Sequence, residues 1–309
     1  SLCRLSAKDY RRCLFMKKRI ILILTSIFIS TGSFVFSQNA VNTMNSHMED
    51  FTTTLNNVIP NTLTGNNVYS NAWIGKFFPS LPMHFSIGVE GGLTKLDTSS
   101  LSEAGKMVQI KNIPNSLFFP TLALNAKIGG LFLPFDVGLS FMTLDSNKLN
   151  ILKDSVDLNY FTIGGNVRYC IIKDKLLLPE VSVGVGYYYS KGDIGKSTSL
   201  YGVNVGYDTK VFLGEIQASK KIVFITPFIG FRAVFSKSES DYNWKAGGSG
   251  LDGVLNGSGS ISHTYEDSFI PQVFGGVGFG LALFQLDING SWDFANSIWN
   301  FGASFRFKL

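Results

Sequence analysis

The chain has 309 residues, of which 45% are hydrophobic, 14% aromatic and 16% charged. It contains 27 Lys and Arg against 22 Asp and Glu, but residues 1–37 hold seven of the basic residues and one acidic residue. The remaining chain, with 20 basic and 21 acidic side chains, is therefore close to neutral. A nucleic-acid partner, which an overall net charge of +5 would otherwise suggest, is not expected.

Residues 16–37 have the pattern of a secretory signal peptide. A basic stretch follows Met16, an apolar run covers residues 20–29, and cleavage is expected after Ser37. The alternative, an uncleaved anchor, needs about 20 apolar residues, and polar residues 30–33 interrupt this run. We therefore expect export through the Sec pathway, and we interpret residues 1–15 as an overcalled start.

After cleavage, the chain has too few cysteines for a disulfide or a cysteine metal site. Cys3 and Cys13 lie before the expected cleavage point, which leaves Cys170 as the single cysteine of the mature chain. An intramolecular disulfide and a cysteine metal site are both excluded on that count, and no cofactor is expected.

The mature chain alternates between apolar and polar residues, which is the pattern of strands with one apolar face. At the C-terminus, odd positions from Trp299 to Leu309 are apolar while even positions from Asn300 to Lys308 are mostly polar. No run after residue 37 approaches 18 apolar residues, so no membrane-spanning helix is expected. The same reading predicts ten strands, near residues 83–95, 119–130, 133–145, 155–172, 176–190, 200–218, 222–237, 265–282, 284–294 and 298–309.

An even number of strands and the lengths of their connections predict an all-β, antiparallel up-and-down transmembrane barrel. Long connections at 96–117 and 238–264 are expected outside, and tight turns at 173–175 and 219–221 are expected in the periplasm with both termini. The alternative is a soluble sandwich or lipocalin-like barrel, which would bury its apolar face. Aromatic residues gathered at strand ends and the low charged fraction favour the membrane.

The last residues carry a recognisable motif. Residues 300–307 follow the order polar, any, Gly, any, any, apolar, any, apolar, although the chain continues through Lys308 to Leu309 instead of ending on an aromatic residue. Together with the signal peptide, this motif resembles the C-terminal assembly signal of bacterial integral outer-membrane β-barrel proteins. The resemblance implies a place in the cell outer membrane, contact with its lipid, and recognition by the barrel-assembly machinery. The residues it assigns to that recognition are Asn300, Gly302, Phe305 and Phe307.

The mature N-terminus has a different period. Apolar residues recur at steps of three and four from Val41 to Val58, which predicts an amphipathic helix over about 40–58 that stops before Pro60. This helix could pack against the periplasmic rim or enter the lumen as a plug, and the sequence does not choose. We assign residues 38–75 to the helix and a linker, and 76–309 to the barrel.

No catalytic pattern accompanies the barrel, so enzymatic activity is not expected. The mature histidines, His47, His84 and His263, are far apart, and the acidic residues near His263 do not match the spacing of omptin-type outer-membrane proteases. The glycine-rich residues 247–250 have no adjoining strand-to-helix pattern or Lys-Ser/Thr pair, which excludes a phosphate loop.

Charged residues on the polar parity of the strands are expected to face the lumen. We expect Arg168, Arg232 and Arg306 to approach Glu90, Asp136 and Asp287 once the barrel closes. The pore-lining candidates are Glu90, Lys127, Asp136, Arg168, Asp208, Lys210, Arg232, Asp287 and Arg306, to which Asp157 and Lys308 are added by parity.

Two functions fit these features. The first is a narrow or gated channel for small or amphipathic solutes, in which lumen charges set selectivity. The second is a structural or surface-interaction barrel, similar to an adhesin, whose lumen is filled by ion pairs and whose long loops make contacts. Of two substitutions in the last strand, Phe307→Asp is expected to disturb assembly and Arg306→Ala to be much milder.

Overall fold

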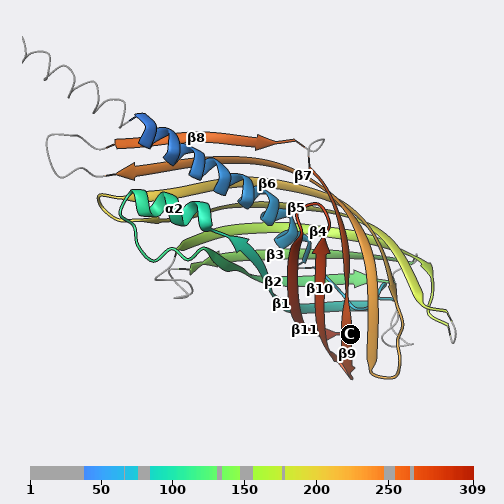
Figure 1. The fold of residues 1–309 in the computed structure, drawn as a ribbon. Helices are drawn as coiled ribbons and strands as arrows, with labels where there is room; N and C mark the ends of the chain where they lie inside the picture. Colours follow the sequence, from blue (N-terminus) through green and yellow to red (C-terminus); the bar gives the residue numbers. More distant parts are fainter. Residues whose placement is uncertain are drawn as a thin grey trace, which may run out of the picture. The chain divides into compact units, whose positions relative to one another are not determined.

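The computed structural model describes residues 38–65, 67–75, 84–130, 134–146, 156–175, 178–246, 255–264 and 268–309 (Figure 1). The expected signal peptide, residues 16–37, and the interpreted overcalled start, residues 1–15, lie outside these ranges. The chain divides into two compact units, Ser1–Ser46 and His47–Leu309. In the first unit, the described residues 38–46 are helical. All contacts discussed below lie within the second unit.

Two helices are present in the described ranges, α1 over residues 38–65 and α2 at Ser99–Met107. In those ranges, no helix combines the length and apolarity needed to cross a membrane. The expected end of α1 before Pro60 is wrong, because the helix continues for five residues beyond the proline. Proline removes a main-chain hydrogen bond there. Side chains from the next turn bind main-chain oxygens, Asn61 Nδ2 to Asn57 O at 3.0 Å and Thr64 Oγ1 to Pro60 O at 3.1 Å.

Ten strands form a closed antiparallel barrel. Each strand pairs with its neighbours in chain order, and β1 pairs with β11, from Ser86↔Lys308 to Thr94↔Asn300, to close the ring. The ring consists of β1 (His84–Asp97), β2 (Ser116–Gly129), β3 (Phe135–Asp145), β4 (Asp157–Ile172), β5 (Glu180–Ser197), β6 (Gly202–Ser219), β7 (Ile225–Ala246), β9 (Phe269–Leu281), β10 (Phe284–Asp293) and β11 (Ile298–Lys308).

The two long connections expected outside are more ordered than predicted. Residues 96–117 contain α2, and much of 238–264 is strand, because β7 runs on to Ala246 and pairs there with β8 (Leu255–His263). β7 thus pairs with β9 along its first half and with β8 along its second half. The alternation in β8 is between polar residues and glycine, so a search for apolar faces misses this strand.

The two faces of the barrel differ in polarity in the way that a membrane requires. Outward side chains such as Leu139 and Ile288 are exposed, at 64% and 52%, whereas inward neighbours such as Ser140 and Asp287 are buried. A soluble barrel would reverse this arrangement. The apolar outer face and polar interior are those of a transmembrane barrel.

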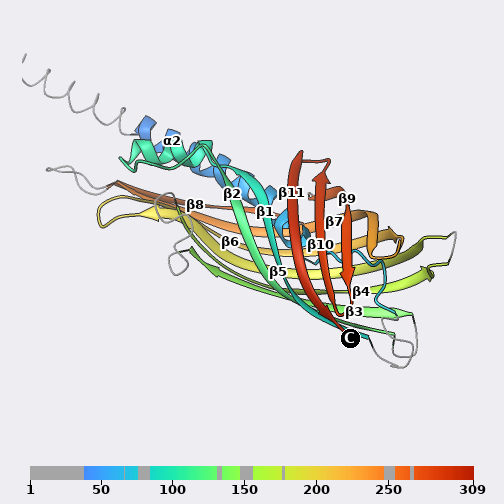
Figure 2. The same cartoon turned by 90° about the horizontal axis from the view of Figure 1, so that it is seen from below.

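The strands have unequal lengths, which gives the barrel a high wall and a low wall. β5, β6 and β7 have 18, 18 and 22 residues, whereas β10 and β11 have 10 and 11. Figures 1 and 2 show β9, β10 and β11 as short strands beside the long ones. We call the end with α2 and the β7–β8 hairpin the long-strand end, and the opposite end the short-turn end. Both β1 and the C-terminus meet at the short-turn end, where Phe85 N donates to Leu309 O at 2.9 Å.

Candidate functional site: an occupied lumen

Residues 47–65 and 67–75, which we call the plug segment, lie inside the barrel. At the long-strand end, Tyr242 Oη donates to Glu49 Oε1 at 3.0 Å and Ser240 Oγ to Asn56 Oδ1 at 2.6 Å. At the short-turn end, the main-chain nitrogen of Ile74 donates to Asp136 Oδ2 at 3.0 Å. Of the two positions that the sequence left open for the N-terminal helix, the structure has the one inside the lumen.

This path corrects the expected course of the chain just before β1. The barrel strands begin and end at the short-turn end, as an even strand number requires, but the plug segment starts at the long-strand end and passes through the lumen before β1. Its first residues therefore lie at the end opposite to the C-terminus. Periodicity could predict the helix but not the direction in which it enters the barrel.

Cysteine labelling can test this direction. In a Cys170→Ser background, we expect Asp50→Cys, an exposed position near the start of the plug segment, to react with a membrane-impermeant maleimide on intact cells. Asp174→Cys, at the short-turn end, should react only after the outer membrane is permeabilised. Equal labelling of both positions on intact cells, or the reverse order, would contradict the assigned direction.

The first half of the plug segment is held by apolar packing. Met48, Phe51 and Leu55 of α1 are fully buried. The lumen wall at the same end is apolar too, since Val203 and Val205 of β6 are fully buried on its inner face. Burial of such side chains contributes about 1.5–3 kcal/mol each.

The second half is held by hydrogen bonds from the wall to the plug main chain. Arg232 Nη1 donates to Thr64 O at 2.7 Å and Arg306 Nη2 to Val68 O at 2.6 Å. Gln217 Nε2 donates to Tyr69 O at 2.6 Å. Residues 67–75 are not helical, so their buried main-chain groups need partners outside the segment, and these side chains provide them.

The inward charges of the wall pair with one another. Arg168 binds Asp136 through two nitrogens, at 3.0 and 2.8 Å, and the register places the two residues directly opposite in β3 and β4. Arg306 binds Glu90 at 3.0 Å and also contacts Asp287. These are pairs that the sequence predicted from strand parity.

Arg232 has a partner that the sequence analysis missed. Its Nε lies 3.0 Å from Glu215 Oε2, and both side chains are buried. Strand parity predicts Asp208 and Lys210 as the inward positions of β6, and both have the opposite parity to Glu215. The wrong assignment has a physical cause. Near the long-strand end, the lumen-facing side of β6 is largely apolar, because it lies beside the apolar half of the plug. Its apolar residues are Val203, Val205, Tyr207 and Val211.

Most of the pore-lining candidates are buried in the lumen: Glu90, Lys127, Asp136, Arg168, Arg232, Asp287 and Arg306. Asp208 and Lys210 are corrected to the outer face, where Asp208 accepts a hydrogen bond from Tyr189 Oη at 2.7 Å and Lys210 lies opposite Tyr189. Asp157 is also outward, on the opposite parity to buried Leu158. Lys308 is inward at the short-turn end, 2.9 Å from Gln285 Oε1.

Tyr69 of the plug lies among three lumen cations. The centroid of its ring is 3.7 Å from the guanidinium carbon of Arg306, 4.3 Å from Lys127 Nζ and 5.9 Å from the guanidinium carbon of Arg168. Desolvated cation–π contacts of this kind are worth about 2 kcal/mol each. Tyr69 is therefore the side chain through which the plug meets the charge network.

Glycines let the plug and the wall approach closely. A Cβ at Gly278 of β9 would overlap the Ser70 side chain of the plug, whereas a Cβ at Gly214 of β6 would have no neighbour within 4 Å. We expect Gly278→Ala to lower the free energy of unfolding by about 1–3 kcal/mol through overpacking. Gly214→Ala should change it far less. Urea unfolding followed by tryptophan fluorescence measures both, and equal effects would mean that the plug does not contact β9 this closely.

The residues expected to form the assembly signal lie in β11. Asn300 and Gly302 are on its inner face, and Asn300 Nδ2 donates to Thr94 Oγ1 at 2.6 Å. Phe305 and Phe307 are on its outer face with ring centroids 5.5 and 5.7 Å from that of Phe284. Their recognition by the assembly machinery stays a prediction.

The residues that the structure describes assemble no metal site. No group of three His, Cys, Asp or Glu side chains among them could hold a metal ion. His47 and His84 lie in the first residues of the plug and of β1, at opposite ends of the barrel. Cys170 is buried and free. Absence of enzymatic activity remains a prediction.

Comparison with known proteins adds no family. No family model and no curated protein matches the chain. Similar solved structures are bacterial outer-membrane β-barrel proteins. The outer membrane protease OmpT from Escherichia coli has 12% identity and a TM-score of 0.45 over 76% of this chain and 99% of that one. A major outer membrane protein from Thermus thermophilus has 11% identity and a TM-score of 0.33 over 74% and 99%. These similarities assign no function to the chain.

Proposed function

We propose that the protein is an outer-membrane channel for small or amphipathic solutes and that the plug segment is its gate. The arrangement described above is then the closed state. Opening requires the plug to be displaced or rearranged, because the plug segment binds side chains on both the high wall and the low wall.

One observation carries this proposal: each lumen arginine has a carboxylate partner in the wall itself. Arg168 pairs with Asp136, Arg232 with Glu215 and Arg306 with Asp287 and Glu90. The plug adds to Arg232 and Arg306 one main-chain oxygen each. A buried charge is costly when it loses its charged partner. Because the wall keeps these pairs when the plug moves, the plug can be released without stranding a charge.

A second candidate is a surface-interaction barrel, and the long-strand end favours it. There α2 and the β7–β8 hairpin extend from the barrel, and they carry mostly polar residues and glycine. In that case the plug is a permanent core and its removal would only destabilise the barrel. Conductance separates the two candidates.

Tyr69 provides the test. Tyr69→Ala removes the ring that three cations contact, and a loss of about 2 kcal/mol of plug binding would shift the closed-to-open ratio on the order of tenfold or more. We expect more frequent openings of the refolded protein in a planar bilayer. Tyr69→Phe keeps the ring and should behave like the parent. A folded Tyr69→Ala barrel as silent as the parent would favour the second candidate.

Contact with outer-membrane lipid follows from the apolar outer face, and insertion by the barrel-assembly machinery is part of the same proposal. The C-terminal strand supports it, since β11 is both the closing strand and the bearer of the expected signal.

A further inference from the structure

A groove lies where the low wall ends, on the rim between β1 and β11. The last pair of these strands is Thr94↔Asn300, yet β1 continues to Asp97, still paired with β2, while β11 begins only at Ile298. Beyond this pair, toward the long-strand end, β1 and β11 no longer pair, and one side of α1 borders the opening between them. The groove formed there has a volume of about 650 Å³, within the ~300–1,000 Å³ of ligand pockets.

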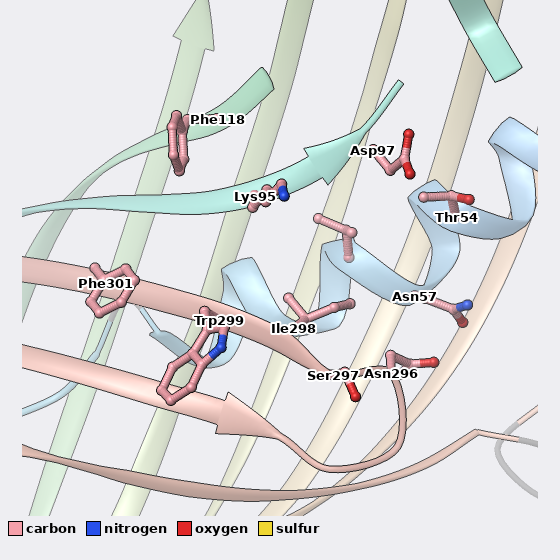
Figure 3. A pocket seen from close by; sticks show the side chains of 11 residues that line it. Thr54, Asn57, Lys95, Asp97, Phe118, Asn296, Ser297, Ile298, Trp299 and Phe301 are labelled. Carbon is pink, nitrogen blue, oxygen red and sulfur yellow. The ribbon is translucent and has the colours of Figure 1, made fainter. Parts of the chain in front are cut away.

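The two halves of the groove have different chemistry (Figure 3). One half is aromatic and lies on the outer face of the barrel, where Phe118, Trp299 and Phe301 are 57%, 53% and 56% exposed. The other half is polar and reaches the plug, with Thr54 and Asn57 of α1. Lys95 and Asp97, on the outer face of β1, lie in the groove wall and supply one charge of each sign.

The aromatic half continues the surface that faces lipid. Phe301 lies opposite Leu93 in the β1–β11 ladder, and both are outward and exposed. Trp299 packs against Trp292 with centroids 4.4 Å apart. Tryptophans are enriched at the membrane–water interface of membrane proteins. A molecule in this groove would therefore have its apolar part in the membrane and its head at the interface.

We infer that the rim groove binds a zwitterionic amphiphile from the membrane, with its acyl chain on Trp299 and Phe301 and its head between Lys95 and Asp97. A phosphodiester would pair with the Lys95 ammonium and a quaternary or primary ammonium with the Asp97 carboxylate. Asn57 and Thr54 provide hydrogen bonds from the plug side. The occupant is a lipid and not a water-dissolved ion, because half of the groove is the lipid-facing surface itself. Binding here does not depend on whether the barrel conducts.

Native mass spectrometry of the full protein in a non-ionic detergent tests this inference. The probes are lysophosphatidylcholine, which is zwitterionic, and lysophosphatidylglycerol, which is anionic and has the same chain. We expect one lysophosphatidylcholine to be retained saturably, with lysophosphatidylglycerol about tenfold weaker. Asn57→Phe fills the groove, and Lys95→Gln combined with Asp97→Asn removes both charges. An asparagine side-chain oxygen at position 97 can still accept the hydrogen bond that Ser99 N donates to Asp97 Oδ1, at 2.9 Å, at the start of α2. Both variants should lose the bound molecule.

The control is Leu139→Phe, which places the same aromatic ring on the lipid-facing surface of β3, away from the groove, and should bind like the parent. Unsaturable binding would overturn the inference. Equal retention of the two probes, or unchanged binding in the charge-neutral variant, would overturn the assignment of the head. Because the readout is bound lipid, a silent barrel that still binds would leave the inference intact and refute only the channel.

Discussion

Replacing Arg306 by methionine is expected to lower the free energy of unfolding by about 3–5 kcal/mol, which is the cost of breaking a buried ion pair on one side. Arg306 is 1% exposed and binds Glu90, Asp287 and the main-chain oxygen of Val68. Methionine fills much of the same space without charge. It leaves the buried carboxylates of Glu90 and Asp287 without their cation, and it leaves the plug without one of its anchors.

Urea unfolding in lipid vesicles measures this loss, and an exposed ion pair gives the matched control. Lys237 lies 3.2 Å from Glu239, and the two side chains are 40% and 63% exposed. Lys237→Met should therefore cost under about 1 kcal/mol. The expectation that Arg306→Ala is milder than Phe307→Asp concerns assembly and stays a prediction, whereas the contacts of Arg306 predict a large loss of stability. Equal losses in the two methionine variants would contradict the network.

The barrel could be predicted closely from the sequence because one signal, a period of two with apolar residues on one face, repeats in every lipid-facing strand. It placed β11 at 298–309, where the structure has Ile298–Lys308, and β10 at 284–294, where the structure has Phe284–Asp293. The signal disappears where strands leave the lipid. For that reason the sequence predicts a loop where the structure has the long-strand part of β7 and the whole of β8.

The lumen was predicted less well, because its contents depend on contacts between distant parts of the chain. Arg168 and Asp136 could be matched, since each lies on a clear inward parity. Glu215 could not be matched to Arg232. Near the long-strand end the lumen-facing residues of β6 are largely apolar because they pack beside the plug, so the rule that polar residues face the lumen fails for this strand. The plug is also the reason that α1 continues past Pro60: burial and side-chain bonds inside the barrel stabilise a turn that the local sequence disfavours.

A displaceable plug makes a large effect expected from one engineered disulfide. Asn56 Oδ1 and Ser240 Oγ are 2.6 Å apart and join the plug to β7. In a Cys170→Ser background, the Asn56→Cys/Ser240→Cys pair can be oxidised to fasten the plug to the wall. The control is Thr209→Cys/Ser238→Cys. Thr209 and Ser238 lie opposite each other in β6 and β7 with their hydroxyl oxygens 3.0 Å apart, and directly opposed cross-strand positions are close enough for a disulfide. This disulfide joins two wall strands and leaves the plug free.

Planar-bilayer conductance of the 56–240 variant, recorded before and after addition of reductant, tests directly whether the plug is a gate. We expect the oxidised protein to be closed, openings to appear when the disulfide is reduced, and the 209–238 variant to open in both states. If the 56–240 variant opened equally with its disulfide intact, or if neither variant ever conducted while both remained folded, residues 47–75 would be a fixed core and the gated channel would be refuted.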